Sequence, residues 1–133
     1  MEEVEKMIFD NIFTQNSILG SAMQAAVIRN NIISNNIANA DVPGFKKKSV
    51  QFENYLAAAL KSSKRGEAID FDKISPTIQV EQGDFFHRMD GNNVDVEEEM
   101  VSLYQNTIKY DTLTSGIINN YKRINLVITG INK

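Results

Sequence analysis

The stretch that decides the fold lies at residues 34–45 and reads Ser34-Asn35-Asn36-Ile37-Ala38-Asn39-Ala40-Asp41-Val42-Pro43-Gly44-Phe45. Pro43 has no N–H for a helix interior and disfavours the helical conformation at Val42, whereas Gly44 takes a positive φ without steric cost. The helical pattern before this stretch is therefore predicted to end at or before Val42, in a turn. Three asparagines, which are mediocre helix formers, precede that end. They indicate either a helix that frays toward its C-terminus or a recognition surface.

Upstream of this stretch, one series of residues recurs at alternating spacings of three and four. The series is Ile12, Asn16, Leu19, Met23, Ala26, Asn30, Ile33, Ile37 and Ala40. Most of these residues are apolar, which predicts one long helix over residues 12–42 with a coiled-coil-like seam. Asn16 and Asn30 either fix the register of a partner helix at some cost in stability or stay wet at the edge of the contact. Residues 1–11 are either a first helical turn or a disordered tail.

A second long helical pattern fills most of residues 93–133 and is predicted to run from Val96 to Ile131. Asp95 is predicted to be its N-cap, with Glu98 at the third helical position as in a capping box. The 3–4 series that follows is Met100, Leu103, Thr107, Tyr110, Thr114, Ile117, Tyr121, Ile124, Ile128 and Ile131. Such a helix would be on the order of 50 Å long, more than a compact globule of this size needs. It therefore needs a partner along its length.

The region between the two helices, residues 43–92, is predicted to be small and irregular, with some β structure. Ser49 is predicted to cap a short helix with one apolar face, formed by Phe52, Tyr55, Leu56, Ala59 and Leu60. Residues 77–81 alternate polar and apolar side chains and predict a short strand, and residues 85–86 suggest a second strand that would form a hairpin with it. The sequence Asp90-Gly91-Asn92-Asn93 is a strong turn signal.

These patterns predict a mainly α fold in one unit, with the long N- and C-terminal helices paired as an antiparallel, coiled-coil-like hairpin. The predicted seam consists of Leu19, Met23, Ile33 and Ile37 with Met100, Leu103, Tyr110, Ile117, Tyr121, Ile124 and Ile128. Several apolar residues fall outside it: Ile18, Ile32, Ile108, Ile118 and Val127. Leftover apolar stripes normally indicate partner helices, so the chain is expected to assemble with copies of itself or with similar helices.

Composition and motifs limit the possible functions. The chain has 133 residues, a net charge of −3, no cysteine and a single histidine, His87. These features disfavour nucleic-acid binding, exclude thiolate chemistry, and leave no constellation for catalysis, a metal or a cofactor. Glu97–Glu99 are read as first-turn acids, and residues 90–95 fail as a calcium loop because Val94 takes a ligand position. No apolar window approaches the ~20 residues of a membrane span, so direct membrane insertion is not expected.

Residues 35–46 resemble the signature of the flagellar rod and hook axial protein family. In that family an N-terminal helix ends in Asn-Asn-x-Ala-Asn, commonly followed by Thr-Pro-Gly and an aromatic residue. The resemblance assigns the assembly signature to Asn35, Asn36, Ile37, Ala38, Asn39, Pro43, Gly44 and Phe45. Val42 stands where threonine is usual, which removes any hydrogen bond of that hydroxyl. The run Val50-x-Phe52-Glu53-x-x-Leu56, and the turn at residues 90–95 before Glu99-Met100, are similar to the short proximal rod proteins of this family.

The resemblance implies a structural component of the bacterial flagellar basal body, a proximal rod subunit that self-assembles through its terminal helices and transmits torque. The implied partners are copies of itself, FlgC-like rod proteins, a FliE-like adaptor and the flagellar type III export apparatus. Such subunits reach the periplasmic rod without a cleaved signal peptide. Phe9-x-x-x-Phe13 resembles an export-recognition pattern, and it is also an ordinary helical pair. The alternatives are another short, FlgC-like rod protein or a cytoplasmic helical adaptor or chaperone-like module.

The resemblance also sharpens the expectation for the asparagines. A buried amide without a partner costs about 1–3 kcal/mol, so each one faces water or bonds to another group. We expect Asn36 and Asn39 to hydrogen-bond across or beside the helix pair, with another subunit as the favoured partner. Pro43 and Gly44 are expected to set the exit angle of the chain toward Phe45.

Overall fold

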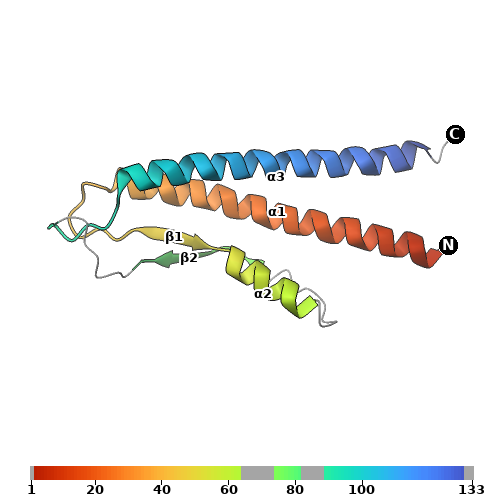
Figure 1. The fold of residues 1–133 in the computed structure, drawn as a ribbon, viewed down its shortest axis with the longest axis horizontal. Coiled ribbons are helices and arrows are strands. Elements are labelled where there is room, and N and C mark those ends of the chain that lie inside the picture. The colour runs from red at the N-terminus through yellow and green to blue at the C-terminus, as the bar shows by residue number, and fades with distance from the viewer. Residues whose placement is uncertain (1, 64–73, 82–88, 131–133) are drawn as a thin grey trace.

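Two long antiparallel helices dominate the structure, and a two-stranded sheet and a short helix lie along one side of them (Figure 1). The computed structural model describes residues 2–63, 74–81 and 89–130. The long helices are α1, Glu2–Ala38, and α3, Val96–Gly130. Both chain ends lie at the same end of the molecule, far from the sheet. The predicted fold class, a mainly α fold with paired terminal helices and a small β-containing middle, is confirmed.

Helix α1 both starts and ends earlier than the pattern predicts. It begins at Glu2, so the reading of the first residues as a disordered tail is wrong for the part that the structure describes. It ends at Ala38, where the N–H of Ala40 bonds to the carbonyl of Ile37, three residues back, at 3.2 Å. Such tightening is typical of a last helical turn. Gly44 then takes a φ of 72°, which completes the predicted turn.

The sheet joins two segments that are far apart in the chain. Strand β1, Lys48–Gln51, pairs antiparallel with strand β2, Thr77–Val80, and Val50 lies opposite Ile78. The strand predicted at residues 77–81 is therefore confirmed. Its predicted hairpin partner at residues 85–86 lies outside the described residues, and the strand that does pair with β2 comes from before the short helix.

Strand β1 also corrects the start of the short helix. Ser49 lies inside β1, so its prediction as an N-cap is wrong. Helix α2 runs over Glu53–Ser63, and the N–H of Leu56 bonds to the carbonyl of Phe52 at 3.0 Å. The error has a physical cause: a serine before an apolar run caps a helix only if the next residues are helical, and here they pair with β2 instead.

The apolar core lies where α2 and the end of the sheet meet the middle of α1. Phe52 and Ile74 are buried against Ala25, and Ala22, Leu56 and Ala59 pack around them. Small alanines on α1 let the larger side chains approach its backbone closely. Two residues of the face predicted for α2, Tyr55 and Leu60, are exposed instead.

The described helices were compared with the requirements of a membrane span and of a metal site. No described helix combines the length and hydropathy needed to cross a bilayer. Within the same residues, no three potential metal-ligating side chains of His, Asp or Glu come together as a metal ion would need.

Candidate assembly site

The site is built around Asn36, which is fully buried in the last turn of α1. Its side-chain amide donates to the carbonyl of Lys48 at 2.8 Å, and its oxygen accepts from the N–H of Lys48 at 3.0 Å. The amide thus pairs with the backbone of β1 as a neighbouring strand would. It also donates to Oε2 of Glu99 at 2.9 Å. Through these hydrogen bonds, Asn36 therefore connects the end of α1 to the start of β1 and to the start of α3.

These hydrogen bonds confirm part of the expectation for the asparagines. Asn36 bonds across the helix pair to Glu99 of α3, and it also bonds to Lys48 of β1. A contact of these asparagines with another subunit stays a prediction. The side-chain amide of Asn39, just after α1, donates to the carbonyl of Asn35 at 2.7 Å, and the backbone carbonyl of Asn39 accepts from Asn92 Nδ2 at 3.0 Å. Asn35 itself is exposed and accepts a long bond of 3.5 Å from Lys48 Nζ.

A buried ion pair completes the contact of Asn36. Glu99 is only 1% exposed, and its Oε1 lies 2.9 Å from Lys47 Nζ. Burial by itself lowers the pKa of Lys47, but the hydrogen bond and charge of Glu99, with the charges of two further carboxylates, outweigh it and raise the pKa. Those carboxylates are Glu98 and Glu81. The ammonium therefore keeps its charge at neutral pH, as a buried carboxylate partner requires.

The start of α3 behaves largely as predicted. Asp95 Oδ1 accepts from the N–H groups of Glu97 and Glu98 at 2.9 and 3.2 Å, which confirms Asp95 as the N-cap. The carboxylate of Glu98 lies 3.4 Å from Lys47 Nζ. In the structure Glu98 therefore joins the ion pair at the helix start, and its reciprocal bond in a capping box stays a prediction.

The sequence reading missed Asn92, which caps the C-terminus of α1 from more than fifty residues away. This buried amide donates to the carbonyls of Asn39, Ala40 and Val42 at 3.0, 2.9 and 2.8 Å. Its oxygen accepts from the N–H of Val94 at 2.8 Å. The turn chemistry signalled a polar loop residue, but no local feature pointed to the carbonyls of a distant helix end as its partners.

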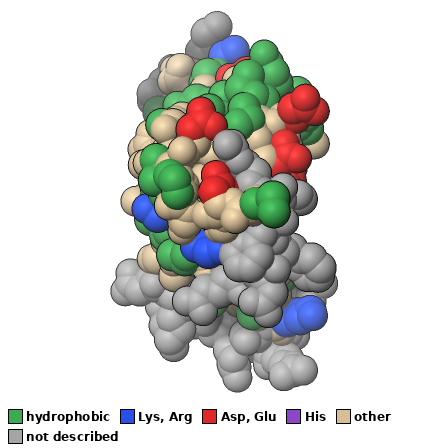
Figure 2. Space-filling model, turned by 90° about the vertical axis from the view of Figure 1, so that its left-hand side faces the viewer, with side chains coloured by type: hydrophobic (Ala, Val, Ile, Leu, Met, Phe, Trp, Pro, Cys, Tyr) green, Lys and Arg blue, Asp and Glu red, His purple; other side chains and the backbone are tan. Residues whose placement is uncertain are grey.

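The same turn holds the segment after α1 by three further bonds. The N–H of Gly44 donates to the carbonyl of Asp90 at 3.0 Å, and Lys46 Nζ donates to the carbonyl of Gly91 at 2.8 Å. Asn93 Oδ1 accepts from the N–H of Lys47 at 2.6 Å. Figure 2 looks onto this end of the molecule, where acidic side chains are scattered among hydrophobic and uncharged ones.

The remaining residues of the predicted signature have differing surroundings. Ile37 and Phe45 are half-buried, and Lys48 Nζ lies 5.7 Å from the centroid of the Phe45 ring. Ala38, Pro43 and Gly44 are exposed. One residue of the signature, Asn36, therefore joins elements within the chain by hydrogen bonds. Another part of the signature is an exposed loop at the end of the molecule.

A second ion pair ties α1 to the start of α2. Arg29 Nη2 lies 2.8 Å from Glu53 Oε2 and also donates to the carbonyl of Val50 at 3.2 Å. Burial raises the pKa of Glu53, but the hydrogen bond from Arg29, a backbone hydrogen bond and the Arg29 charge outweigh it, so the pKa of this carboxylate is lowered. The pair fixes the position of α2 beside the long helices.

Two asparagine bridges cross between the long helices. Asn120 Nδ2 donates to Asn16 Oδ1 at 3.0 Å, and Asn106 Nδ2 donates to Asn30 Oδ1 at 2.8 Å. Within each helix the two asparagines are two heptads apart, so both bridges form in a single antiparallel alignment. Of the two readings of Asn16 and Asn30, the structure therefore supports the one in which they fix register.

At every other seam position, the residue of α3 that faces α1 is the one immediately before the predicted residue. The inward positions, buried or half-buried, are Glu99, Leu103, Asn106, Tyr110, Leu113, Ile117, Asn120 and Ile124. Of the predicted α3 seam residues, Leu103, Tyr110, Ile117 and Ile124 lie on this side, whereas Met100, Tyr121 and Ile128 are exposed. On α1, Ile33 is buried and Leu19, Met23 and Ile37 are half-buried. The pattern favoured apolar residues, but Glu99, Asn106 and Asn120 each have a polar partner on α1.

Replacing one asparagine bridge by leucines tests its role in register. We expect the double variant Asn16→Leu with Asn120→Leu to gain about 1–2 kcal/mol in the free energy of unfolding, because a polar pair becomes an apolar one. We also expect the helices to pair in more than one register. Spin labels near the chain ends should give one distance in the parent protein and several in the variant. A single unchanged distance would contradict the assignment.

The sequence of this chain is similar to the sequences of known flagellar rod proteins. Residues 17–46, which contain Asn36 and the end of α1, match the family model described as flagella basal body rod protein. The chain is 39% identical to the flagellar basal body rod protein FlgB of Bacillus subtilis (strain 168), over 84% of this chain and 91% of the relative. It is 31% identical to FlgB of Borreliella burgdorferi, over 76% and 85% of the two chains, and 31% identical to FlgB of Yersinia enterocolitica, over 68% and 76%.

Proposed function

This chain belongs to the family of the flagellar basal body rod protein FlgB, whose members are structural subunits of the proximal rod, and we propose that it self-assembles through its terminal helices and transmits torque. The observation that carries the proposal is the match to FlgB over nearly the whole length of both chains. Because the family is a structural one, the chain is not assigned an enzymatic activity.

The outward face of α3 supports assembly through the helices. Large apolar side chains are exposed along its whole length, among them Val101, Tyr104, Ile108, Ile118 and Leu126. A single chain offers nothing that covers them in the described structure. Stripes of this size on a helix pair normally pack against other helices.

The buried polar contacts that join the two long helices at one end support the transmission of torque. Asn36, Glu99 and Lys47 join α1, β1 and α3 through buried polar contacts, and Asn92 closes the end of α1. Such contacts break only at a cost of several kcal/mol when one partner is lost. A twisting load on one helix would therefore pass to the other rather than separate them.

The chain assembles with other components of the flagellar rod, as its family does. The proposed partners within that set are further copies of this chain, FlgC-like rod proteins and a FliE-like adaptor. We further propose export by the flagellar type III apparatus into the periplasmic part of the basal body. Phe9 and Phe13, the candidate export residues, both fall within α1.

The proposal is tested in a flagellated host from which the gene for this chain has been deleted. We expect the deletion strain to be non-motile and to lack rods, and expression of the chain to restore both. Immunoblots should detect the protein in purified basal bodies. A protein confined to the cytoplasmic fraction, with normal rods in its absence, would instead support the helical-adaptor alternative.

A further inference from the structure

The turn that closes the end of α1 contains a dipeptide with a chemistry of its own. Asp90-Gly91 is the single Asp-Gly pair of the sequence, which contains no Asn-Gly pair. The backbone nitrogen of a residue can attack the carboxyl group of a preceding aspartate. The attack is least hindered when that residue is glycine, because glycine has no Cβ, and a β-branched residue obstructs it. The sequence therefore distinguishes Asp90 from the other aspartates of the chain.

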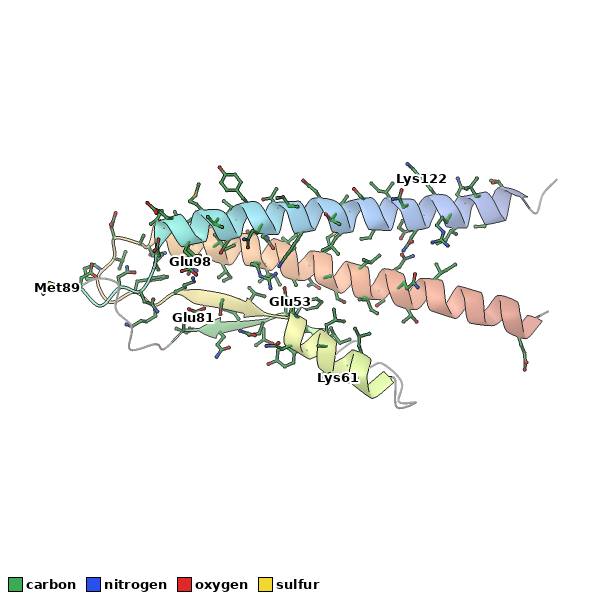
Figure 3. The ribbon with its side chains drawn as sticks, in the orientation of Figure 1. Glu53, Lys61, Glu81, Met89, Glu98 and Lys122 are labelled. Carbon is green, nitrogen blue, oxygen red and sulfur yellow. The ribbon has the colours of Figure 1, made fainter. Side chains whose placement is uncertain are left out.

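The pair lies in an exposed turn, outside the helices and strands. Asp90 is exposed, and the side chain of Met89, immediately before it, is fully exposed. Figure 3 shows Met89 at the tip of the molecule, beyond the ends of both long helices. Water therefore reaches the carboxyl group of Asp90, as a reaction that releases and then takes up water requires.

The hydrogen bonds of this turn leave the reacting nitrogen uncommitted. Asp90 Oδ1 accepts from the N–H of Asn92 at 3.1 Å. This bond spans Gly91 and holds the carboxyl group over the Gly91 peptide unit. Among the residues that the structure describes, the N–H of Gly91 donates to no acceptor. An attack by this nitrogen would therefore break no hydrogen bond that the nitrogen makes within the described structure.

We propose that Asp90-Gly91 is a site of spontaneous aspartate isomerisation, and that the product releases the segment held at the end of α1. The Gly91 nitrogen forms a bond to Cγ of Asp90, and the carboxyl OH leaves as water with the amide proton. The product is a five-membered succinimide ring. Water opens this ring at the former main-chain carbonyl, which becomes a free carboxylate, and the chain then continues through Cβ and Cγ as isoaspartate. One water molecule is lost and one is consumed, so the reaction needs no oxidant, reductant or further reactant.

Isomerisation changes the acceptor that holds the segment after α1. In the unmodified chain the main-chain carbonyl of Asp90 accepts from the N–H of Gly44 at 3.0 Å. In isoaspartate that oxygen belongs to a charged carboxylate on a branch, and one extra carbon separates residues 90 and 91 along the backbone. Asn92, whose amide caps three carbonyls at the end of α1, follows directly and is displaced with the lengthened turn. A single modification therefore weakens both contacts of this turn with the end of α1.

Ageing of the purified full chain in neutral buffer tests the site. Tryptic peptides are separated by chromatography and identified by mass spectrometry with fragmentation. Isomerisation shifts the retention of a peptide without changing its mass, whereas deamidation of Asn92 or Asn93 changes the mass. Asp41 is the matched internal control, because it is also exposed and outside the helices but precedes the β-branched Val42. We expect the isomerised fraction at Asp90 to exceed that at Asp41 at least tenfold.

Hydrogen exchange of the Gly44 amide, followed by NMR, tests the consequence. The aged protein should contain a rapidly exchanging population equal in size to the isomerised fraction. Asp90→Glu keeps a carboxylate but would have to form a six-membered ring, which closes far more slowly, so it should develop neither isoaspartate nor this population. The inference is overturned if Asp90 isomerises no faster than Asp41, or if Gly44 stays as protected in the aged protein as in the fresh one. If Asp90→Glu does not fold, the comparison of Asp90 with Asp41 in the parent still decides.

Discussion

Replacement of Asn36 by leucine is expected to lower the free energy of unfolding by about 3–5 kcal/mol. The leucine removes the partner of the N–H and the carbonyl of Lys48 and one partner of the buried Glu99 carboxylate. Each buried group left unpaired costs about 1–3 kcal/mol. Since the free energy of unfolding of a domain is only about 5–15 kcal/mol, the variant would lose much of its stability. Urea unfolding followed by far-UV circular dichroism measures the change.

Asn35→Ala is the matched control for this variant. Asn35 is the preceding residue of the same helix and is exposed. Its side chain accepts a long bond of 3.5 Å from Lys48 Nζ, and its carbonyl accepts from Asn39 Nδ2 at 2.7 Å. We expect its effect to stay within about 0.5 kcal/mol. Equal effects of the two variants would contradict the central position of Asn36 in the site.

Ile33→Asp is expected to separate the helix pair. Ile33 is 5% exposed on the face of α1 that packs against α3. A carboxylate there would be buried without a partner, for which we expect a loss of about 3–5 kcal/mol. The variant should show reduced helicity and rapid proteolysis, and cells that carry it should build no rods. Circular dichroism, limited proteolysis and swimming assays measure these three effects.

Val27→Asp controls for the charge itself. Val27 lies in the same helix but is 44% exposed, so water solvates a carboxylate there. We expect near-parent helicity and a change of less than about 1 kcal/mol in the free energy of unfolding. A variant at Ile33 that folds and swims normally would contradict the prediction that Ile33 is needed for the pairing of α1 with α3.

The site gives the asparagine-rich signature a physical meaning. The side chain of Asn36 fastens three elements of one chain, and the preceding and following asparagines act locally or face solvent. The signature therefore prepares a rigid unit, and the apolar faces of α3 remain for contacts between units. Assembly and internal rigidity are thus supplied by different residues of the same long helices.

Local rules were sufficient for much of the fold. The end of α1 before Pro43, the N-cap at Asp95 and the strand at residues 77–81 follow from the preferences of a few neighbouring residues. The two long 3–4 series also predicted an antiparallel pair of terminal helices, because a long amphipathic helix needs a partner. The sequence by itself therefore determined the elements and their broad arrangement.

Only the tertiary structure decided which polar residues are buried. Asn36 meets Glu99 across 63 residues of chain, Asn106 meets Ala26 across 80, and Asn120 meets Asn16 across 104. A polar side chain is stable inside only if its partner is in place, and no local pattern reveals a partner at that distance. For the same reason, the predicted seam of α3 was one residue away from the observed seam at alternate positions. The pairing of β1 with β2 and the cap formed by Asn92 became visible only in the folded chain.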